Sequence, residues 1–378
     1  MKRFFSFLIL LAPVLFSLNL VAQSKVFVSG DGGYKSFRIP AILKAPNGDL
    51  LAFCEGRLNG SSDFGNIKIV LKRSADNGKT WRPLQVVASN DSLQAGNPAP
   101  VVDLTDPEFP KGRIFLFYNT GDASESEIRN GKGHRDVLYK TSIDNGRTWG
   151  DPVDITTQVN RIDQPAINLQ WNFKEDWRSY ANTPGHALQF EDGKYKGRIY
   201  VAANHSAGPP KQNFKDYQAH GFYTDDHGAT FHLSETVPFP GSNESSAAPL
   251  TNGRLMMNSR NQTGKHRIVS LSSDGGATWD TTFVDYNLPD PICEGSVLNI
   301  GIRKGKTVLA FCNNIDTSHR DSLTLHISFN CGKTWRKNIL IDPKNTGYSD
   351  IVKISKKEIG VLYEADGYRE IRFQLIKI

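Results

Sequence analysis

An eight-residue pattern occurs five times along the chain and constrains the fold more than any other sequence feature. Its third residue is Asp in four copies and Asn in the last, its fifth is Gly, its seventh is Thr, and its eighth is Trp or Phe. Five copies with the same internal spacing indicate a structural repeat rather than unrelated polar turns. The copies are SADNGKTW (74–81), SIDNGRTW (142–149), TDDHGATF (224–231), SSDGGATW (272–279) and SFNCGKTW (328–335).

The residue types in this pattern are those of a tight turn between two strands. A short Asp side chain accepts hydrogen bonds from backbone amides, here expected two residues ahead, and glycine adopts the positive φ angles that such turns require. The Thr and the aromatic residue then begin another strand. Each copy therefore predicts a hairpin turn that is held by its own side chains.

Segments rich in β-forming residues separate the copies, which lie 48 to 82 residues apart. Examples are GRIFLFY (112–118), GRIYVAA (197–203) and KTVLAF (306–311). No long amphipathic helix competes with them, and only DWRSYA (176–181) suggests a turn of helix. This spacing fits one four-stranded sheet per copy plus loops, so we expect an all-β fold, a β-propeller.

The first 22 residues predict a secretory signal peptide, because Lys2 and Arg3 precede an apolar run that ends in small residues near Ala22. An uncleaved membrane anchor is the alternative. Cleavage would leave residues 23–378, a single domain of six blades at about 59 residues each. We expect the terminal strands, KVFVSG (25–30) and YREIRFQLIKI (368–378), to close the ring within one blade. The mature chain would be periplasmic or extracellular, without stable membrane insertion.

The formal net charge of +6 suits an anionic ligand, but no dense Lys and Arg run interleaved with aromatic residues indicates nucleic-acid binding. The nine histidines form no HxH or HExxH group, and SGDGGYKS (29–36) lacks the pattern of a cofactor-binding loop. We therefore expect no metal, no cofactor and no nucleic-acid partner.

Four cysteines, Cys54, Cys293, Cys312 and Cys331, allow three disulfide pairings. They are widely spaced and form no CxxC motif, which makes metal ligation and redox chemistry poor explanations. Buried free thiols are the expected state.

One arginine interrupts a segment that otherwise predicts a buried strand, GYKSFRIPAIL (33–43). Side chains alternate along a strand, so Phe37 and Ile39 would point one way and Arg38 the other. Pro40 removes a backbone donor just where a central strand would need one. Because burying an unpaired guanidinium is costly, we expect Arg38 to meet an anion.

The FRIP motif (37–40) followed by the spaced repeats resembles the sialidase (neuraminidase) superfamily, in which such repeats are called Asp boxes. The resemblance covers nearly the whole chain after residue 22. It implies a six-bladed β-propeller and a secreted retaining exo-α-sialidase acting on sialylated glycans, that is, glycoproteins, glycolipids and oligosaccharides.

The resemblance also implies that three arginines bind the carboxylate of sialic acid, since planar bidentate donors suit this group. They are Arg38 in FRIP, Arg260 in LMMNSRNQ (255–262) and Arg320, which precedes the last Asp box. Arg303 and Arg336 are the alternatives to Arg320.

The same substrate carboxylate disfavours a carboxylate nucleophile. At about 4 Å and an effective dielectric near 20, the repulsion is about 4 kcal/mol, or roughly a thousandfold in rate. A neutral tyrosine avoids this repulsion if a neighbouring base takes its proton. The resemblance assigns Tyr348 in NTGYSDI (345–351) as the nucleophile and Glu244 in GSNESSAAPL (241–250) as the base.

Four further residues have roles that the resemblance implies. Asp63 corresponds to the acid/base that protonates the leaving oxygen and then activates water. Arg57 and Asn97 would line the pocket near the sugar's 4-hydroxyl, and Glu364 would brace Arg38. Asn97 stands where some relatives have Asp. Glu294 stands where the family usually has Gln, and both departures bear on substrate preference.

The segment TPGHALQF (183–190) resembles part of the rim of the site, which makes His186 and Gln189 candidate contacts.

Two other functions are weighed against hydrolysis. A trans-sialidase, including an intramolecular one, needs an aromatic acceptor platform, for which Trp171, Trp177 and Tyr180 are available. A non-catalytic sialic-acid-binding propeller should lack Asp63, Tyr348 or Glu244, and all three are present.

Overall fold

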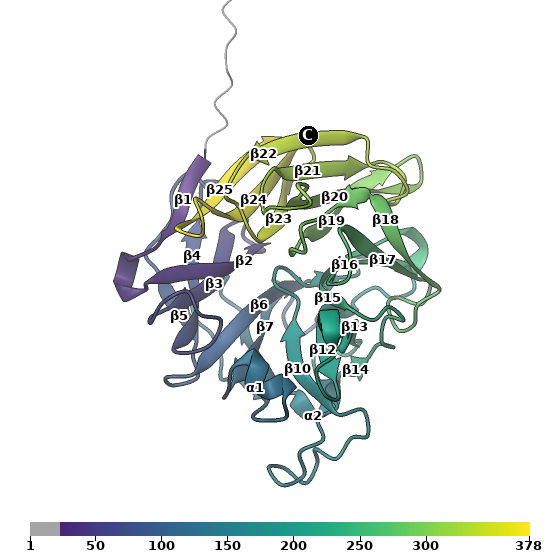
Figure 1. Cartoon of the computed structure of the whole chain (residues 1–378). Helices are drawn as coiled ribbons and strands as arrows, with labels where there is room; N and C mark the ends of the chain where they lie inside the picture. The colour runs from purple at the N-terminus through teal and green to yellow at the C-terminus, as the bar shows by residue number, and fades with distance from the viewer. Residues whose placement is uncertain (1–22) are drawn as a thin grey trace, which may run out of the picture.

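The computed structural model describes residues 23–378, which form β-sheets arranged in a ring around a central axis (Figure 1). The predicted all-β propeller fold is confirmed. The predicted signal peptide, residues 1–22, lies outside the described residues. Among residues 23–378, no helix is both long enough and apolar enough to cross a membrane.

Four of the sheets have the size of one blade. The first contains, in spatial order, β1 (Gln23–Val28), β25 (Glu370–Lys377), β24 (Glu358–Ala365) and β23 (Ser349–Ser355). The second contains β10 (Trp177–Asn182), β12 (Ile199–Ala207), β13 (Tyr217–Thr224) and β14 (His232–Leu233), with β11 (Leu188–Gln189) paired to β12. The third contains β15 (Ser242–Pro249), β16 (Leu255–Asn261), β17 (His266–Ser272) and β18 (Thr281–Pro289). The fourth contains β19 (Ser296–Arg303), β20 (Lys306–Asn314), β21 (Leu323–Ser328) and β22 (Lys337–Asp342).

The remaining sheet is twice as wide, with eight strands. They are β2 (Ser36–Lys44), β3 (Leu50–Arg57), β4 (Ile67–Ser74), β5 (Gln85–Ala88), β6 (Gln94–Asp103), β7 (Arg113–Gly121), β8 (Arg135–Ser142) and β9 (Val153–Asp154). A single parallel residue pair, Ile67 with Gln94, joins β4 to β6. The prediction of six separate blades is therefore not met when hydrogen-bonded sheets are counted. The reason is local, because the turn at Asn90–Leu93 brings the start of β6 against the edge of β4.

The two ends of the described chain meet in one sheet, as predicted. β1 pairs with β25 in antiparallel register, from Gln23 opposite Gln374 to Val28 opposite Glu370. In Figure 1 the purple start of the ring lies beside its yellow end. The innermost strands β2, β6, β11, β15, β19 and β23 contact one another in a closed cycle. The longer strands β2 and β15 have residues at both openings of the axial channel, whereas the two residues of β11 lie at one of them.

The Asp boxes form the turns before the outermost strands β5, β9, β14, β18 and β22. In the second copy, Asp144 Oδ1 accepts hydrogen bonds from the amides of Arg147 and Thr148, both at 2.9 Å, and Oδ2 accepts from the Thr148 hydroxyl at 2.6 Å. These amides lie three and four residues ahead rather than the predicted two. The difference arises because the glycine amide has another acceptor, since Gly146 donates to Ser142 Oγ at 2.9 Å.

The Asn of the last box preserves this arrangement. Asn330 Oδ1 accepts from the Thr334 amide at 3.0 Å, and Asn330 Nδ2 donates to the Thr334 hydroxyl at 2.9 Å. The hydroxyl that donates to a carboxylate in the other copies becomes an acceptor here. An amide side chain can therefore replace the carboxylate in this turn.

The box glycines are required for two physical reasons. Gly78 and Gly276 have φ angles of +83° and +93°, which side chains rarely adopt. A Cβ atom on Gly78 would overlap the ring of Phe373, and one on Gly276 would overlap the ring of Tyr200. Both rings belong to the preceding sheet, so each turn packs closely against its neighbour.

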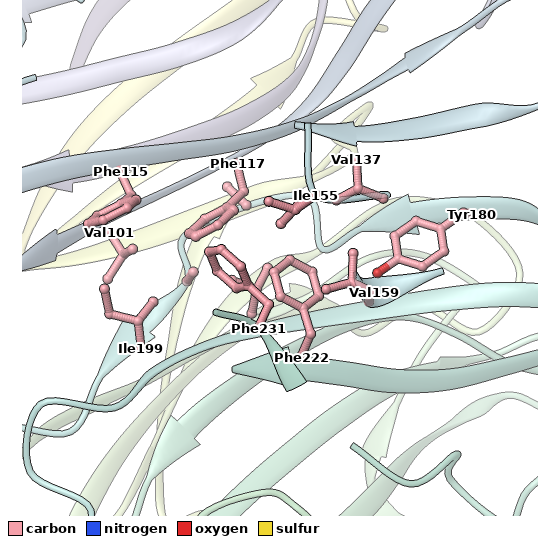
Figure 2. Close-up of a cluster of buried hydrophobic side chains, with 14 of the residues drawn as sticks. Val101, Phe115, Phe117, Val137, Ile155, Val159, Tyr180, Ile199, Phe222 and Phe231 are labelled. Carbon is pink, nitrogen blue, oxygen red and sulfur yellow. The ribbon is translucent and has the colours of Figure 1, made fainter. Parts of the chain in front are cut away.

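The hydrophobic cores lie between adjacent sheets. Figure 2 shows one of them, in which Phe115, Phe117 and Val137 pack against Phe222 and Phe231 of the next sheet. Phe231 is the aromatic residue of its Asp box, and its ring lies 5.8 Å from that of Phe117 in an edge-to-face contact. The repeat thus supplies both the turn and part of the interface between sheets.

The helical turn suggested at DWRSYA is wrong, because Trp177–Asn182 is the strand β10. Aromatic residues favour strands, and pairing with β12 buries Trp177 and Tyr180. The helices of the described chain are α1 (Glu125–Arg129), α2 (Thr156–Val159) and the short 3₁₀ turns Asp31–Gly33, Gln212–Phe214 and Thr251–Gly253. All four cysteines are free. Cys54, Cys293 and Cys312 are buried, and Cys331 is partly exposed.

Substituting the box aspartate tests the role of these turns. We expect Asp144→Ala to lower the free energy of unfolding by about 1–2 kcal/mol, because the side-chain hydrogen bonds of the turn are lost. Asp144→Asn should lose less, since Asn330 forms the equivalent turn. Urea unfolding of both variants measures the difference. Equal destabilisation by Asn and Ala would contradict the assigned hydrogen bonds.

Candidate active site

A polar cavity of about 310 Å³ lies at one opening of the axial channel. Its lining includes residues of the innermost strands β2, β6 and β15, of the adjacent strands β3 and β16, and of the loops after β3 and β20. All the predicted catalytic and carboxylate-binding residues line it, together with two of the predicted pocket residues. These are Arg38, Arg57, Asp63, Asn97, Glu244, Arg260, Arg320 and Tyr348.

Bulges in the innermost strands direct several of these side chains. The register of β2 shifts between Arg38 and Ala41, and that of β6 shifts between Gly96 and Ala99. At these bulges Ile39 and Asn97 have φ angles of 59° and 54°. A positive φ angle is unfavourable for a β-branched residue such as Ile39. The bulge at this residue kinks the strand, so the side chains of FRIP do not follow the simple alternation that was predicted. Irregularities of this kind are typical of functional sites.

A buried carboxylate holds the first arginine. Glu364 has no exposed surface, and its Oε1 accepts from Arg38 Nε at 2.6 Å. Its oxygens also accept from the backbone amides of Ile39 and Tyr348, both at 2.9 Å. Burial by itself would lower the pKa of Arg38, but Glu364 raises it above its ordinary value. Arg38 is therefore a fixed cation, and the predicted brace is in contact with it.

The other two arginines lie around the ring of Tyr348. Arg260 Nη1 donates to Glu244 Oε2 at 2.6 Å and to Tyr348 Oη at 3.0 Å. The guanidinium carbon of Arg320 lies 5.5 Å from the centre of the tyrosine ring, and that of Arg38 lies 5.7 Å from it. Three cations therefore surround one aromatic ring.

The alternatives to Arg320 lie elsewhere. Arg303 is stacked on Phe329, at 5.1 Å from the ring centre, and Arg336 is on the outer side of the same sheet. Neither lines the cavity.

Tyr348 and Glu244 form a direct contact. The tyrosine hydroxyl lies 2.6 Å and 2.7 Å from the two carboxylate oxygens, and the tyrosine is 6 % exposed. Burial and the Glu244 charge raise the pKa of Tyr348 well above its usual value, whereas Arg260 and Arg320 lower it. The resting hydroxyl is therefore protonated and donates to Glu244. This geometry allows the carboxylate to receive the proton if the oxygen attacks an electrophile.

A second group of charges lies across the cavity. Arg57 donates to Glu55 Oε2 through Nε and Nη2, at 3.0 and 2.7 Å, and pairs with Asp63 Oδ1 at 2.7 Å. The Asp63 side chain is 76 % exposed, on the loop between β3 and β4. The backbone amide of Asn97 donates to Glu55 Oε1 at 3.0 Å. An exposed carboxyl at the mouth is thus anchored by a buried arginine.

Several residues of the site were missed by sequence reasoning, among them Glu55 and Tyr368. Glu55 is buried and contacts both Arg57 and Asn97. Its position two residues before Arg57 on one strand face was a usable signal. The ring of Tyr368 lies 4.3 Å from the Arg38 guanidinium, and its hydroxyl accepts from Arg320 at 3.3 Å. Tyr368 lies in a hairpin turn, where the sequence carries no comparable signal.

The predicted rim contacts are wrong. His186 pairs with Asp350 inside the axial channel, and Gln189 binds Asp103 and Thr105. Neither lines the cavity that contains Tyr348. The segment containing them reaches the channel from the opposite side, which its sequence alone does not reveal.

The candidate acceptor platform is also absent from this cavity. Trp171 and Trp177 are each 6 % exposed, and Tyr180 is fully buried. Trp177 stacks on His205 with ring centres 3.6 Å apart, and Trp171 packs on His134. These aromatic residues are core residues within the described chain.

Among residues 23–378, one group has the composition of a possible cation site, namely Asp103, Asp106 and His227. Asp103 contacts His227 Nδ1 at 2.7 Å, and Asp106 pairs with Arg113 at 2.7 Å. The Arg113 guanidinium binds Asp106 Oδ2, an oxygen that a metal ion would need as a ligand. We therefore describe this group as an ion-pair network.

Glu294 lies behind the cavity. It is 2 % exposed, and its Oε2 accepts from the Ser349 amide at 2.9 Å, while Oε1 has no partner among the described residues. Burial raises the pKa of Glu294 well above its usual value, and the charges of Asp350 and Glu244 raise it further. A carboxyl that keeps its proton is electrically similar to the Gln that the sequence resemblance leads us to expect at this position.

The chain matches the family model described as "BNR repeat-like domain" over residues 48–361. Among curated proteins, it is 31% identical over 377 residues to the sialidase of Micromonospora viridifaciens, a match that covers 94% of this chain and 54% of the relative. It is 28% identical over 374 residues to the sialidase of Paraclostridium sordellii, covering 94% of this chain and 88% of the relative. The chain thus spans about half the length of the first relative and most of the second.

Solved structures are similar over nearly the same length. The Hadza microbial sialidase Hz136 superposes with a TM-score of 0.76 at 26% identity, over 93% of this chain and 67% of the other. The intramolecular trans-sialidase from Ruminococcus gnavus has a TM-score of 0.73 at 18% identity, over 94% of this chain and 97% of the other. The second comparison shows a shared fold.

The class of protein that these observations define is a β-propeller enzyme with Asp-box turns. On its family match and its relatives, the chain belongs to the BNR-repeat sialidase family.

Replacing Glu294 tests its protonation. In the folded state this carboxyl keeps its proton at pH values where the unfolded chain has lost it, so its contribution to stability falls as pH rises above about 4.5. We expect Glu294→Gln to remove this loss. The variant should therefore become increasingly more stable than the wild type, by about 1.4 kcal/mol for each pH unit in which only the unfolded state ionises.

Urea unfolding between pH 4.5 and 8 measures this difference. The exposed Glu108 provides the control, since Glu108→Gln should leave the pH dependence unchanged. A stability difference between Glu294→Gln and the wild type that does not change with pH would show that Glu294 ionises normally.

Proposed function

We propose that this enzyme is a secreted, retaining exo-α-sialidase that removes terminal sialic acid through a covalent bond to Tyr348. The observation that carries the proposal is the contact of Tyr348 Oη with both oxygens of Glu244, at 2.6 and 2.7 Å, in a cavity lined by three arginines. A tyrosine held by a base among guanidinium groups suits a substrate with a carboxylate at its reacting carbon.

The three arginines bind the substrate carboxylate. Arg38 uses Nε and Nη2 for Glu364, which leaves Nη1 for the ligand. Arg260, which donates to the tyrosine hydroxyl, and Arg320, whose guanidinium carbon lies 5.5 Å from the ring centre, complete the set. Because these cations are held in place before binding, little reorganisation opposes complex formation.

In the first step, Tyr348 Oη forms a bond to the anomeric carbon and transfers its proton to Glu244. The bond from this carbon to the leaving oxygen breaks, and that oxygen takes a proton from Asp63. In the second step, water attacks the same carbon and gives its proton to Asp63. The bond to Tyr348 breaks, and its oxygen takes back the proton from Glu244. Two inversions give net retention.

The exposed position of Asp63 is compatible with its role as an acid. The carboxyl pairs with Arg57 at 2.7 Å, which holds it and its loop at the cavity mouth. In this position it can reach the leaving oxygen of a glycan whose terminal sugar occupies the cavity.

Three finer proposals accompany the activity. Residues 1–22 direct export, so that the enzyme meets sialylated glycans in the periplasm or outside the cell. The reaction requires no metal or organic cofactor, because the proposed steps use only side chains and water. The eight-stranded sheet acts as two blades, β2–β5 and β6–β9, which gives six in total. The single residue pair between its halves and the closed cycle of innermost strands support this division.

Transfer to an acceptor and binding without turnover are the alternatives. Trp171, Trp177 and Tyr180 are buried and cannot form the predicted acceptor platform, but Phe214 lines the cavity and is 43 % exposed, so it is a candidate aromatic surface for an acceptor. A binding-only propeller has no need for a tyrosine paired with a base. Incubation with a sialoside and a neutral acceptor, with free sialic acid and transfer product measured together, separates hydrolysis from transfer.

Substitution of Arg38 tests carboxylate recognition. We expect Arg38→Lys to weaken binding of a dehydrated sialic-acid analogue about 10- to 100-fold, because charged hydrogen bonds of about 1.5–3 kcal/mol are lost. Titration calorimetry measures the change, and Arg303→Lys, which lies outside the cavity, is the control. Unchanged affinity in a folded Arg38→Lys protein would remove Arg38 from the site.

Substitutions of Tyr348 and of Asp63 should reduce the activity in different ways. Tyr348→Phe removes the attacking oxygen, so activity should fall by orders of magnitude on every substrate. Asp63→Ala removes only the proton donor and base. An aryl leaving group needs little protonation, so kcat/KM on an aryl sialoside should fall far less than on a sialyl-galactoside. On the sialyl-galactoside we expect kcat/KM to fall by about 10²- to 10⁴-fold.

The measurement is kcat/KM on both substrates for both variants, with mapping of the label left by a fluorinated sialosyl donor. Tyr286→Phe, at an exposed tyrosine, is the control. Equal losses on the two substrates for Asp63→Ala would remove its acid role. A label on a carboxylate instead of Tyr348 would overturn the mechanism.

A further inference from the structure

One arginine of the active-site cavity has no role in the proposed reaction. Arg135 is the first residue of β8, it is 8 % exposed, and its side chain lines the cavity. Arg38, Arg57 and Arg260 line the same cavity, and each forms an ion pair with a carboxylate. Arg135 has no such partner among residues 23–378. Because a buried guanidinium without an acceptor is costly, an acceptor supplied by a ligand would be stabilising.

The hydrogen bonds of Arg135 leave one nitrogen open to the cavity. Nη1 donates to the Tyr180 carbonyl of β10 at 3.1 Å, and Nε is enclosed by protein without a partner. Nη2 has no hydrogen bond among residues 23–378, and it is not enclosed in this way. Since the side chain lines the cavity, Nη2 is the nitrogen that a ligand can reach.

The neighbouring strands explain how this side chain reaches the cavity. Gln94 of β6, Gly121 of β7 and Arg135 of β8 lie side by side in register across three adjacent strands. A Cβ atom on Gly121 would lie 3.2 Å from Gln94 Oε1 and 3.5 Å from Arg135 Cγ. Glycine therefore leaves room for the arginine to extend over β7. Because β8 follows β6 and β7 outward from the axis, the guanidinium is recessed in the cavity wall.

Arg135 and Tyr348 lie on opposite sides of the ring. In the closed cycle β2, β6, β11, β15, β19 and β23, the strand β11 is three places from β23. Tyr348 directly precedes β23, whereas Arg135 binds β10, which belongs to the same sheet as β11. Arg57 of β3 and Asn97 of β6, the residues expected near the 4-hydroxyl of the sugar, lie between the two along the ring.

The ring of sialic acid indicates which of its groups faces this wall. In a six-membered ring the carbon C5 lies opposite the anomeric carbon C2, and C4 is its neighbour. With C2 at Tyr348 and the 4-hydroxyl near Arg57 and Asn97, the substituent on C5 points toward Arg135. In an N-acylated sialic acid this substituent ends in a carbonyl oxygen, which extends two bonds further than a hydroxyl would. The longer group suits a recessed guanidinium.

A neighbouring charge favours a neutral acceptor over an anion. Glu125 also lines the cavity, and its Oε1 accepts from the Tyr217 hydroxyl. Burial raises the pKa of Tyr217 well above its usual value, the Glu125 charge raises it further, and the Arg135 charge lowers it, so both charges lie near this hydroxyl. Glu125 would repel a second anion bound at Arg135. An amide carbonyl accepts from a guanidinium without adding charge.

We propose that Arg135 is a specificity-determining residue, which donates from Nη2 to the carbonyl of the N-acyl group on C5 of sialic acid. This role rests on the proposed sialidase function and adds the class of sugar. The enzyme selects N-acylated sialic acids over the deaminated sugar, which has a hydroxyl on C5.

Two aryl glycosides that differ only at C5 test this assignment, one of N-acetylneuraminic acid and one of its C5-hydroxy counterpart. We expect the wild type to have a kcat/KM about tenfold or more higher on the N-acetyl substrate, because the hydroxyl leaves Nη2 without its acceptor. Arg135→Lys keeps the positive charge but loses the planar donors, so the ratio of the two kcat/KM values should fall toward one.

Arg161→Lys is the matched control. The Arg161 carbonyl accepts from the Trp177 amide of β10, so this arginine lies on the same side of the ring, but it does not line the cavity. The same substitution at position 161 should therefore leave the ratio at its wild-type value.

A dehydrated sialic-acid analogue with ¹³C in its acyl carbonyl gives a readout that needs no turnover. A hydrogen bond from a guanidinium lowers the stretching frequency of a carbonyl. In infrared difference spectra, the labelled band should therefore lie at lower frequency in the complex with the wild type than in the complex with Arg135→Lys.

Each of three results would overturn the proposal. A wild-type ratio near one would do so even if Arg135→Lys failed to fold. Equal losses on both substrates in Arg135→Lys would assign the residue a structural role or a contact with another part of the sugar. A labelled band at the same frequency in both complexes would exclude the hydrogen bond. A wild type that neither cleaves either substrate nor binds the analogue would overturn the proposed function, and this role of Arg135 with it.

Discussion

Buried carboxylates satisfy backbone amides that the strands around the axis leave without a ladder partner. At the bulges of β2 and β6, the amides of Ile39 and Asn97 donate to Glu364 and Glu55 at 2.9 and 3.0 Å. Further along β2, the Ile42 amide donates to Asp350. A buried amide without an acceptor would cost about 1–3 kcal/mol. The kinked strands, and therefore the direction of the side chains they carry, depend on these acids.

The same carboxylates also hold basic side chains. Glu364 binds Arg38, Glu55 binds Arg57, and Asp350 binds His186. Charge compensation stabilises a buried carboxylate, so Glu364 and Glu55 each hold an arginine at the channel as well as accepting a backbone amide. The arginines at the active-site opening are therefore in position before any ligand arrives, which is the arrangement that favours electrostatic catalysis.

Much of the fold followed from local signals. The five turn patterns indicated hairpins because their hydrogen bonds close within eight residues, and the all-β ring with paired termini followed from their spacing. Much of the site could also be predicted. Motifs that resemble a known family assigned Arg38, Tyr348 and Glu244 to it, and all three line one cavity. Tyr368 was missed, and His186 was assigned to the wrong opening. Their positions depend on how distant strands are oriented about the axis, which short motifs do not encode.

The sequence by itself determined the turns, the alternation of apolar residues that builds the sheets, and the residue types available for chemistry. It did not determine how the sheets join, since one residue pair between β4 and β6 makes a double-width sheet. Only the tertiary structure decided which end of the channel each side chain faces, and which groups remain without a partner. The physical reason is that burial and ion pairing arise between residues hundreds of positions apart, such as Arg38 and Glu364, and exist only once the ring has closed.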